Sequence, residues 1–310
     1  MKNRLANLPV PILPTMVGAC TLSNVFQSLG YTGVRHITMI AASVILLVYL
    51  GKIIVHFDTF RKEYRTTVPS SLYAGFTMVL MILGSYYFDM NAMIGKAMWF
   101  TGIILHTIHI LLFTIRNLRN FQWDTFVPSW FVTYNGIMVS TVVGGVMKEP
   151  LIAKIVVYYG IAVFTLIIPF MIYRLIKFPI KDAMFHTQAI VLAPSSLCVV
   201  SYLNVVETPN PLILYYLYAA VLCALLFIII KLPSFFSFPF APGYAGLTFP
   251  MAIGIVATTK FSAYLVGEGR SEAAVMLKEL SGIQLYLTTG IIAYVLIQFV
   301  IMLKKSLAVS

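Results

Sequence analysis

Charged side chains are scarce in this chain, because only 10% of its 310 residues are Asp, Glu, Lys or Arg. A soluble domain carries about 25% charged residues. The shortage excludes an ordinary soluble enzyme, a disordered chain and a nucleic-acid binder, although the formal net charge is +11. By contrast, 60% of the residues are hydrophobic and the mean hydropathy is +0.92. The composition therefore predicts a multi-pass membrane protein with little chain left for a separate soluble domain.

Side chains for metal binding or catalysis are few as well. The three cysteines (Cys20, Cys198 and Cys223) lie in apolar runs, and their spacing fits neither a metal site nor a disulfide framework. His106 and His109 are one helical turn apart, but their apolar run offers no third ligand, so we interpret them as a hydrogen-bonded pair. No catalytic triad, paired carboxylate or phosphate-binding loop is visible. We therefore predict no enzyme activity, no metal and no cofactor.

Acidic residues are absent from the interior of every apolar run. Proton-coupled transporters usually keep carboxylates inside the membrane, and cation pathways use acidic rings. Their absence argues against both. The one charged side chain well inside an apolar run is basic, Lys260. It attracts anions in one interpretation and reaches toward the outer interface in the other.

Apolar runs long enough to cross a bilayer predict ten transmembrane helices in one domain, residues 1–310. Fourteen of the 21 Lys and Arg residues lie at the termini and in the connections on the same side, whereas six lie on the opposite side. The excess of positive charge places both termini in the cytoplasm. The predicted helices are 11–29, 36–57, 68–88, 92–115, 127–147, 150–175, 184–206, 210–231, 240–265 and 279–303.

Proline recurs in the odd-numbered helices, at positions separated by 55, 59, 66 and 56 residues. The odd-numbered helices also hold nine of the nineteen glycines and many Ser and Thr residues. This spacing indicates five helical hairpins in which odd and even helices differ in role. The small residues serve either close helix packing or the wall of a solute path. The recurring prolines are Pro14, Pro69, Pro128, Pro194 and Pro250.

Phe249 is a large ring amid small residues, in the sequence Gly243–Met251. It lies about nine residues, or roughly 13 Å, from the start of its predicted helix, close to the middle of a bilayer. Pro250 follows it and cannot donate a backbone hydrogen bond. The ring is either an ordinary packed Phe or a hydrophobic plug that blocks hydrated ions.

Three segments resemble a known family, the tellurite-resistance and dicarboxylate transporters. This family includes bacterial TehA and the plant guard-cell slow anion channels. The ninth predicted helix carries the most specific likeness, in Leu247–Met251 and Ile255–Phe261. The first and seventh helices resemble the family in Leu13-Pro14-Thr15 with Gly18, and in Ile190–Pro194 with Cys198-Val199 and Tyr202-Leu203.

The resemblance implies an all-α fold of five hairpins in quasi-fivefold order, with odd-numbered helices around a central pore. It also implies a homotrimer with one pore per subunit and a gating phenylalanine, which corresponds to Phe249. We therefore predict a passive anion channel of the bacterial inner membrane, with small inorganic or organic anions as solutes and the bilayer as surroundings. The alternatives are a secondary transporter of C4-dicarboxylates such as malate, or a tellurite-resistance efflux protein. The predicted pore-lining residues are Gly18, Ser71, Gly136, Pro194, Ser195, Gly246, Thr248 and Pro250.

Overall fold

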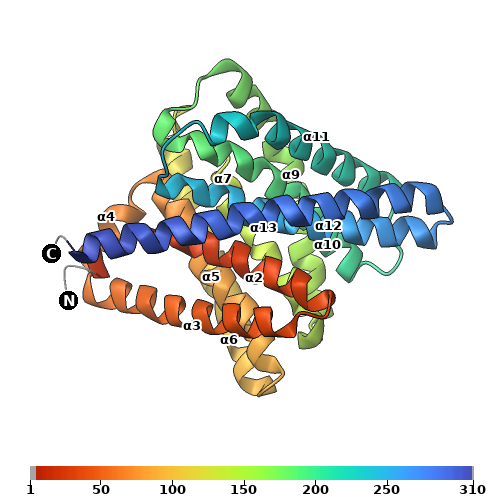
Figure 1. Cartoon of the computed structure of the whole chain (residues 1–310), viewed down its shortest axis with the longest axis horizontal. Helices are drawn as coiled ribbons and strands as arrows, with labels where there is room; N and C mark the ends of the chain where they lie inside the picture. Colours follow the sequence, from red (N-terminus) through yellow and green to blue (C-terminus); the bar gives the residue numbers. More distant parts are fainter. Residues whose placement is uncertain (1–4, 309–310) are drawn as a thin grey trace.

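The computed structural model describes residues 5–308, and within this range the chain is helical and contains no strand. Long helices follow one another as antiparallel pairs joined by short turns (Figure 1). The first described residues (red) and the last turns of α13 (blue) lie at the same end of the bundle (Figure 1). Eight helical segments of the described range are long and apolar enough to cross a membrane.

Five helical segments form the interior of the bundle. Each long helix has a most apolar stretch of 18 residues. The share of that stretch that is buried is 72% in the third predicted helix, 83% in the seventh and 67% in the ninth. Most residues of the first and fifth predicted helices are likewise buried. These five inner segments are α2 (Ile12–Ser28), α5 (Thr67–Phe88), the run α7 (Trp130–Tyr134), η1 (Gly136–Met138), α8 (Val139–Val143) and η2 (Gly144–Met147), the pair η3 (Asp182–Val191) and α10 (Leu192–Val205), and the pair η4 (Pro242–Leu247) and α12 (Thr248–Gly267).

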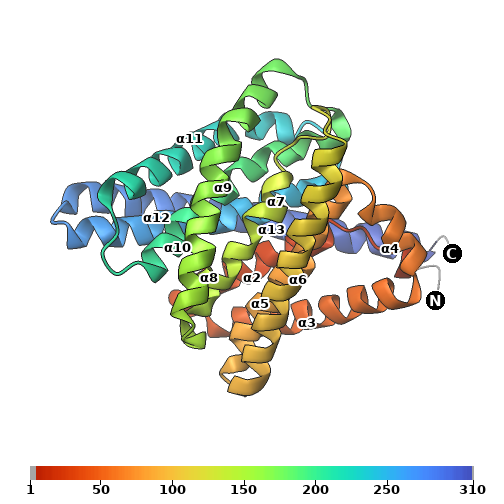
Figure 2. The same ribbon diagram turned by 180° about the vertical axis from the view of Figure 1, so that it is seen from behind.

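Five outer helices cover these inner segments. In the same kind of stretch, only 28% of the residues are buried in four of the outer helices and 39% in the fifth, which suits contact with lipid. Figures 1 and 2 show opposite sides of the bundle, with α13 in front in one and α6 and α9 in front in the other. The outer helices are α3 (Thr32–Val55), α6 (Ala92–Arg119), α9 (Pro150–Lys177), α11 (Pro211–Phe235) and α13 (Ser271–Ala308), and the short helix α4 (Phe57–Tyr64) connects α3 to α5.

Four of the five recurring prolines mark the starts of inner helices, and the fifth, Pro128, lies in the turn before α7. Pro14, Pro69, Pro194 and Pro250 are each the third residue of an α-helix. The first turn is the part of a helix whose N–H groups have no partner within the helix, so proline is tolerated there. Before Pro194 and Pro250 the chain forms the tighter 3₁₀ helices η3 and η4.

The fifth predicted helix, residues 127–147, is not continuous. It is divided into two short α-helices and two 3₁₀ helices. Gly136, Gly144 and Gly145 are poor helix formers. At the first break, the side-chain amide of Asn135 donates to the carbonyl oxygen of Gly160 on α9 at 3.0 Å, so a contact between segments holds the interrupted backbone in place. With α2 only 17 residues long, two of the ten predicted spans are thus shorter or more irregular than the sequence suggests.

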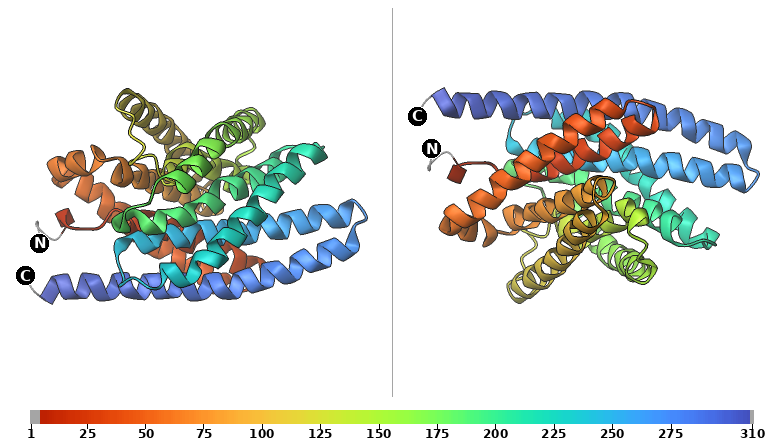
Figure 3. Two further views of the ribbon diagram at one scale, coloured as in Figure 1. Left: turned by 90° about the horizontal axis from the view of Figure 1, so that it is seen from above. Right: turned by 90° about the horizontal axis from the view of Figure 1, so that it is seen from below.

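The inner segments contact one another in a closed cycle. α2 packs on α5, α5 on α7 and α8, α8 on α10, α10 on α12, and α12 on α2 again. The last contact depends on Gly18, because a Cβ at this position would lie 2.6 Å from the backbone nitrogen of Phe249. Each outer helix packs on the inner segment of its own hairpin (Figure 3). The cycle brings residues more than 230 positions apart in the sequence, such as Pro14 and Thr248, into contact.

Candidate functional site

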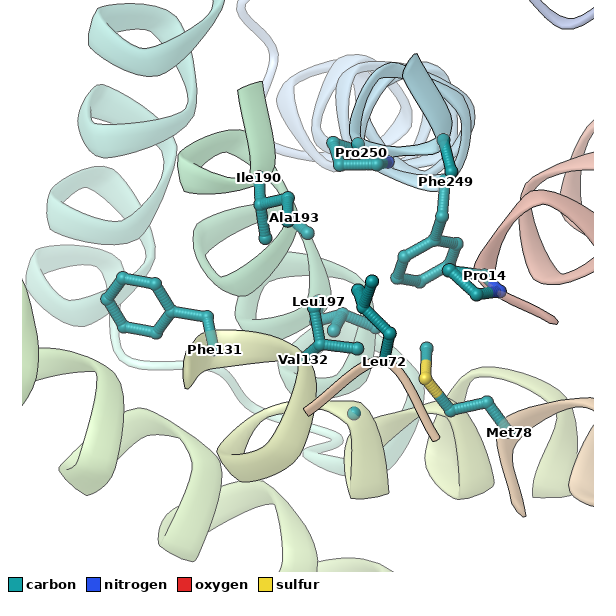
Figure 4. Close-up of a pocket in the computed structure, with 13 residues that line it drawn as sticks. Pro14, Leu72, Met78, Phe131, Val132, Ile190, Ala193, Leu197, Phe249 and Pro250 are labelled. Carbon is teal, nitrogen blue, oxygen red and sulfur yellow. The ribbon is translucent and has the colours of Figure 1, made fainter. Parts of the chain in front are cut away.

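All five inner segments line one small cavity near the centre of the bundle. Its volume is about 20 Å³, which is room for about one water molecule. Figure 4 shows side chains from several inner segments turned toward this space. The lining residues are Pro14 of α2; Leu72 and Met78 of α5; Phe131, Val132 and Gly136 of the fifth segment; Ile190, Ala193 and Leu197 of the seventh; and Ala245, Gly246, Phe249 and Pro250 of the ninth.

The ring of Phe249 lies at the boundary of this cavity. It extends from α12 toward Pro14 of α2 (Figure 4), and only 6% of the residue is exposed. The same side chain also lines a second, larger cavity of about 350 Å³. Phe249 therefore borders both a narrow apolar space and a wider one.

The larger cavity is lined in part by the second half of α2 and by α12, and it carries polar groups. Thr21, Asn24 and Ser28 line it from α2, at the three- and four-residue spacing that places them on one helical face. On α12 the lining includes Phe249 and Lys260, which are eleven residues apart and so lie on the same face, about 16 Å from each other. The path from the ring to the ammonium group thus follows a single face of α12.

The electrostatic character of this larger cavity is positive. Lys260 is half-buried and makes no ion pair with any described residue. Arg35, which pairs with Asp89 at 3.7 Å, donates from Nε to Oδ1 of Asn24 at 3.0 Å. This bond orients the Asn24 amide and leaves its N–H groups as donors. Since none of the described residues that line either cavity is a carboxylate, the arrangement favours an anion over a cation.

The structure distributes the predicted pore-lining residues over three environments. Gly136, Gly246 and Pro250 line the small cavity. Gly18 and Thr248 lie in the contact between α2 and α12, where the hydroxyl of Thr248 donates to the carbonyl oxygen of Ala245 at 2.8 Å. Ser71, Pro194 and Ser195 are buried behind the wall; Ser71 donates to Val68 within its own helix, and Ser195 lines a groove on the outer side of α10.

Sequence analysis missed most of the apolar lining and the polar face of α2. The small cavity is bounded largely by Leu, Ile, Val, Met and Phe side chains, which resemble any other apolar residue of a membrane helix. The face of Thr21, Asn24 and Ser28 was accessible to a search for helical periodicity. Asn24 in particular carries a polar amide on this face of α2.

The two histidines of α6 take part in hydrogen bonds between helices. His106 bonds through Nδ1 to the hydroxyl of Thr77 at 2.6 Å and through Nε2 to the carbonyl oxygen of Thr133 at 2.9 Å. His109 bonds to the hydroxyls of Tyr64 at 2.5 Å and Thr133 at 3.1 Å. All four ring nitrogens have partners, so this pair connects α4, α5, α6 and α7.

A comparison of the sequence with known families identifies the family of this chain. The family model SLAC1, described as voltage-dependent anion channel, matches residues 7–303, nearly the whole chain. The chain belongs to the SLAC1 family. No curated protein matches it.

Membership of the SLAC1 family agrees with the resemblance seen in the sequence. The SLAC1 proteins are channels and transporters for anions rather than enzymes. Together with the eight apolar helices, the match confirms an α-helical, multi-pass membrane protein that carries anions. The two cavities are thus those of a SLAC1 protein, and within residues 5–308 no carboxylate lines either of them.

Proposed function

We propose that this SLAC1 protein is a passive anion channel whose pore runs between the five inner segments and is closed by Phe249. The pore has quasi-fivefold order, with one inner helix of each hairpin in its wall. Gly136, Gly246 and Pro250 contribute to the narrow part of the wall, and Lys260 attracts anions to the wider entrance. The channel forms a homotrimer in the cell membrane, with both termini in the cytoplasm.

One observation carries this proposal: five segments distant in sequence meet at a single apolar constriction that holds the Phe249 ring. A space of about 20 Å³ admits one water molecule but no hydrated anion. A hydrophobic constriction of this kind excludes ions because they cannot lose their water there. The constriction supports the assignment of this conformation to a closed channel.

Reconstituted vesicles test channel activity against coupled transport. Vesicles loaded with potassium chloride and containing the Phe249→Ala variant should release chloride only after valinomycin gives potassium a path to balance the charge. The initial rate should rise in proportion to the chloride gradient. Release that saturates and follows the gradient of a second ion would instead support the alternative, a coupled transporter of dicarboxylates such as malate.

The role of Lys260 is tested by charge removal at the wide cavity. Lys260→Gln in the Phe249→Ala background should reduce the preference for chloride over potassium about two-fold to five-fold, because the charge at the entrance is partly solvated. The loss should be smaller in high salt. Reversal potentials in planar bilayers measure it. Lys278→Gln, which removes an exposed lysine of α13, serves as the matched control and should leave the preference unchanged.

The orientation of α10 predicts a contrast between two nearby positions. In a cysteine-free Phe249→Ala background, Ala193→Cys should react with a small, charged thiol reagent, because Ala193 lines the small cavity. Ser195→Cys should react at least about ten-fold more slowly, since Ser195 faces the groove on the lipid side of the helix. Equal rates at the two positions would place the water-filled path elsewhere.

A further inference from the structure

An apolar groove lies on the outside of the bundle, away from the proposed pore. It has a volume of about 560 Å³ and is bounded by α9 on one side, α11 on the other and the η3–α10 segment at its base. Both α9 and α11 pack on α10 (Figure 2). Small residues on α11, Ala219, Ala220 and Ala224, leave the space open. Because neither the pore nor the gate uses this groove, it needs an explanation of its own.

The groove has the length of one membrane leaflet. Its lining on α9 runs from Phe164 to Ile176, which is twelve residues or about 18 Å, and on α11 from Tyr216 to Phe227, about 16 Å. Half of the hydrocarbon core of a bilayer is about 15 Å thick. An acyl chain of one leaflet would therefore extend along the whole groove and end where the groove ends.

Basic residues lie at one end of the groove, the end at which α9 and α11 both finish. Lys177 follows the last lining residue of α9 and is exposed. Lys231 lies one turn beyond Phe227 on α11, with its ammonium 5.7 Å from the centre of the Phe185 ring. Among the described residues neither lysine has an ion-pair partner, whereas the nearby Lys181 pairs with Asp124 at 2.8 Å. Lys177 and Lys231 therefore carry positive charges that no described carboxylate pairs with.

We propose that the groove between α9 and α11 binds an anionic phospholipid of the cytoplasmic leaflet. One acyl chain lies along α9 and α11, and the headgroup phosphate lies near Lys177 and Lys231. The apolar groove has the length of one leaflet and suits an acyl chain, and the two lysines at its interfacial end suit an anionic headgroup. The base of the groove is formed by Val191 and Ser195, and the other face of the same segment lines the gate cavity with Ala193. A bound lipid therefore packs directly against a wall of the proposed pore, although its binding does not depend on that function.

Fluorescence quenching by brominated lipids tests the site. Phe227→Trp places a reporter in the groove, and Leu226→Trp places one at nearly the same depth but toward bulk lipid, where Leu226 is 59% exposed. The signal of each is read as the difference from the parent protein, which has three tryptophans. The vesicles contain phosphatidylcholine and phosphatidylglycerol, with one of the two brominated on its acyl chains.

Phe227→Trp should reach half-maximal quenching at an about five-fold lower mole fraction of brominated phosphatidylglycerol than of brominated phosphatidylcholine. Leu226→Trp should be quenched equally by both. Adding Lys177→Gln and Lys231→Gln should abolish the preference, and the matched pair Lys304→Gln and Lys305→Gln at the chain end should preserve it. Tyr216→Trp, at the other end of the groove, provides a second reporter if Phe227→Trp does not fold.

Three results would overturn the proposal. Equal quenching of the groove reporter by both lipids would mean that the groove holds only bulk lipid. A preference that survives removal of Lys177 and Lys231 would place the headgroup elsewhere. Loss of quenching by either lipid in Phe227→Trp, with normal quenching in Leu226→Trp, would show that a second copy of the chain covers the groove.

Discussion

Phe249→Ala is expected to increase anion conductance at least ten-fold. Phe249 lines both the small cavity and the wide one, and the neighbouring Gly246 has no side chain to replace the ring. A ten-fold increase corresponds to only about 1.4 kcal/mol of barrier, and removal of a hydrophobic constriction that excludes hydrated ions should exceed this. Phe249→Leu, which keeps part of the apolar bulk, should give an intermediate conductance. Current through planar bilayers or oocytes measures both.

A second phenylalanine of the same helix provides the control. Phe261 is also buried, but its ring stacks on Tyr218 of α11 at 3.9 Å and lines neither cavity. Phe261→Ala removes the same side chain and should lower stability by about 3–5 kcal/mol without raising the conductance. If Phe249→Ala folds as a normal oligomer and conducts no more than the parent, the ring is a packing residue and the gate lies elsewhere.

Glu63→Gln is expected to destabilise the protein strongly. Lys52 is fully buried, and its ammonium donates to Oε1 of Glu63 at 2.8 Å and to the carbonyl oxygen of Leu8 at 2.7 Å. The other carboxylate oxygen of Glu63 accepts from the hydroxyl of Tyr73 at 2.5 Å. Removing the negative charge leaves a buried ammonium without its counter-ion, which costs about 3–5 kcal/mol. The midpoint of thermal unfolding in detergent should fall accordingly.

Two further variants separate this effect from general damage to α4. Asp58→Asn removes an exposed carboxylate from the same short helix and should change the stability by no more than about 0.5 kcal/mol. The double variant Lys52→Met with Glu63→Gln removes both charges and should recover most of the loss, because no buried ion remains unpaired. A double variant as unstable as the single one would mean that the shape of the pair, rather than its charge, holds α3, α4 and α5 together.

Much of the architecture follows from local features of the chain. Low charge and long apolar runs predict a membrane protein, and Pro14, Pro69, Pro194 and Pro250 mark where inner helices begin. Phe249 and Lys260 are eleven residues apart and therefore share one face of α12, so their alignment could be predicted from their spacing in the sequence. The breaks in the fifth segment were less predictable. The interrupted backbone there is held partly by the distant carbonyl of Gly160, which no local pattern indicates.

The sequence by itself determined that this protein is helical, lies in a membrane and has five proline-marked segments. The reason is that composition and the positions of proline affect the backbone locally. Only the tertiary structure decided which side of each inner helix faces the cavity. It placed Ala193 on the cavity and Ser195 on the outer groove. It also buried Gly18 in a contact between helices, although a small residue at this position is equally compatible with a pore wall. The physical reason is that lipid is about as apolar as a protein core. A membrane helix can therefore be apolar on every side, and only packing against the other helices distinguishes its inner face from its outer one.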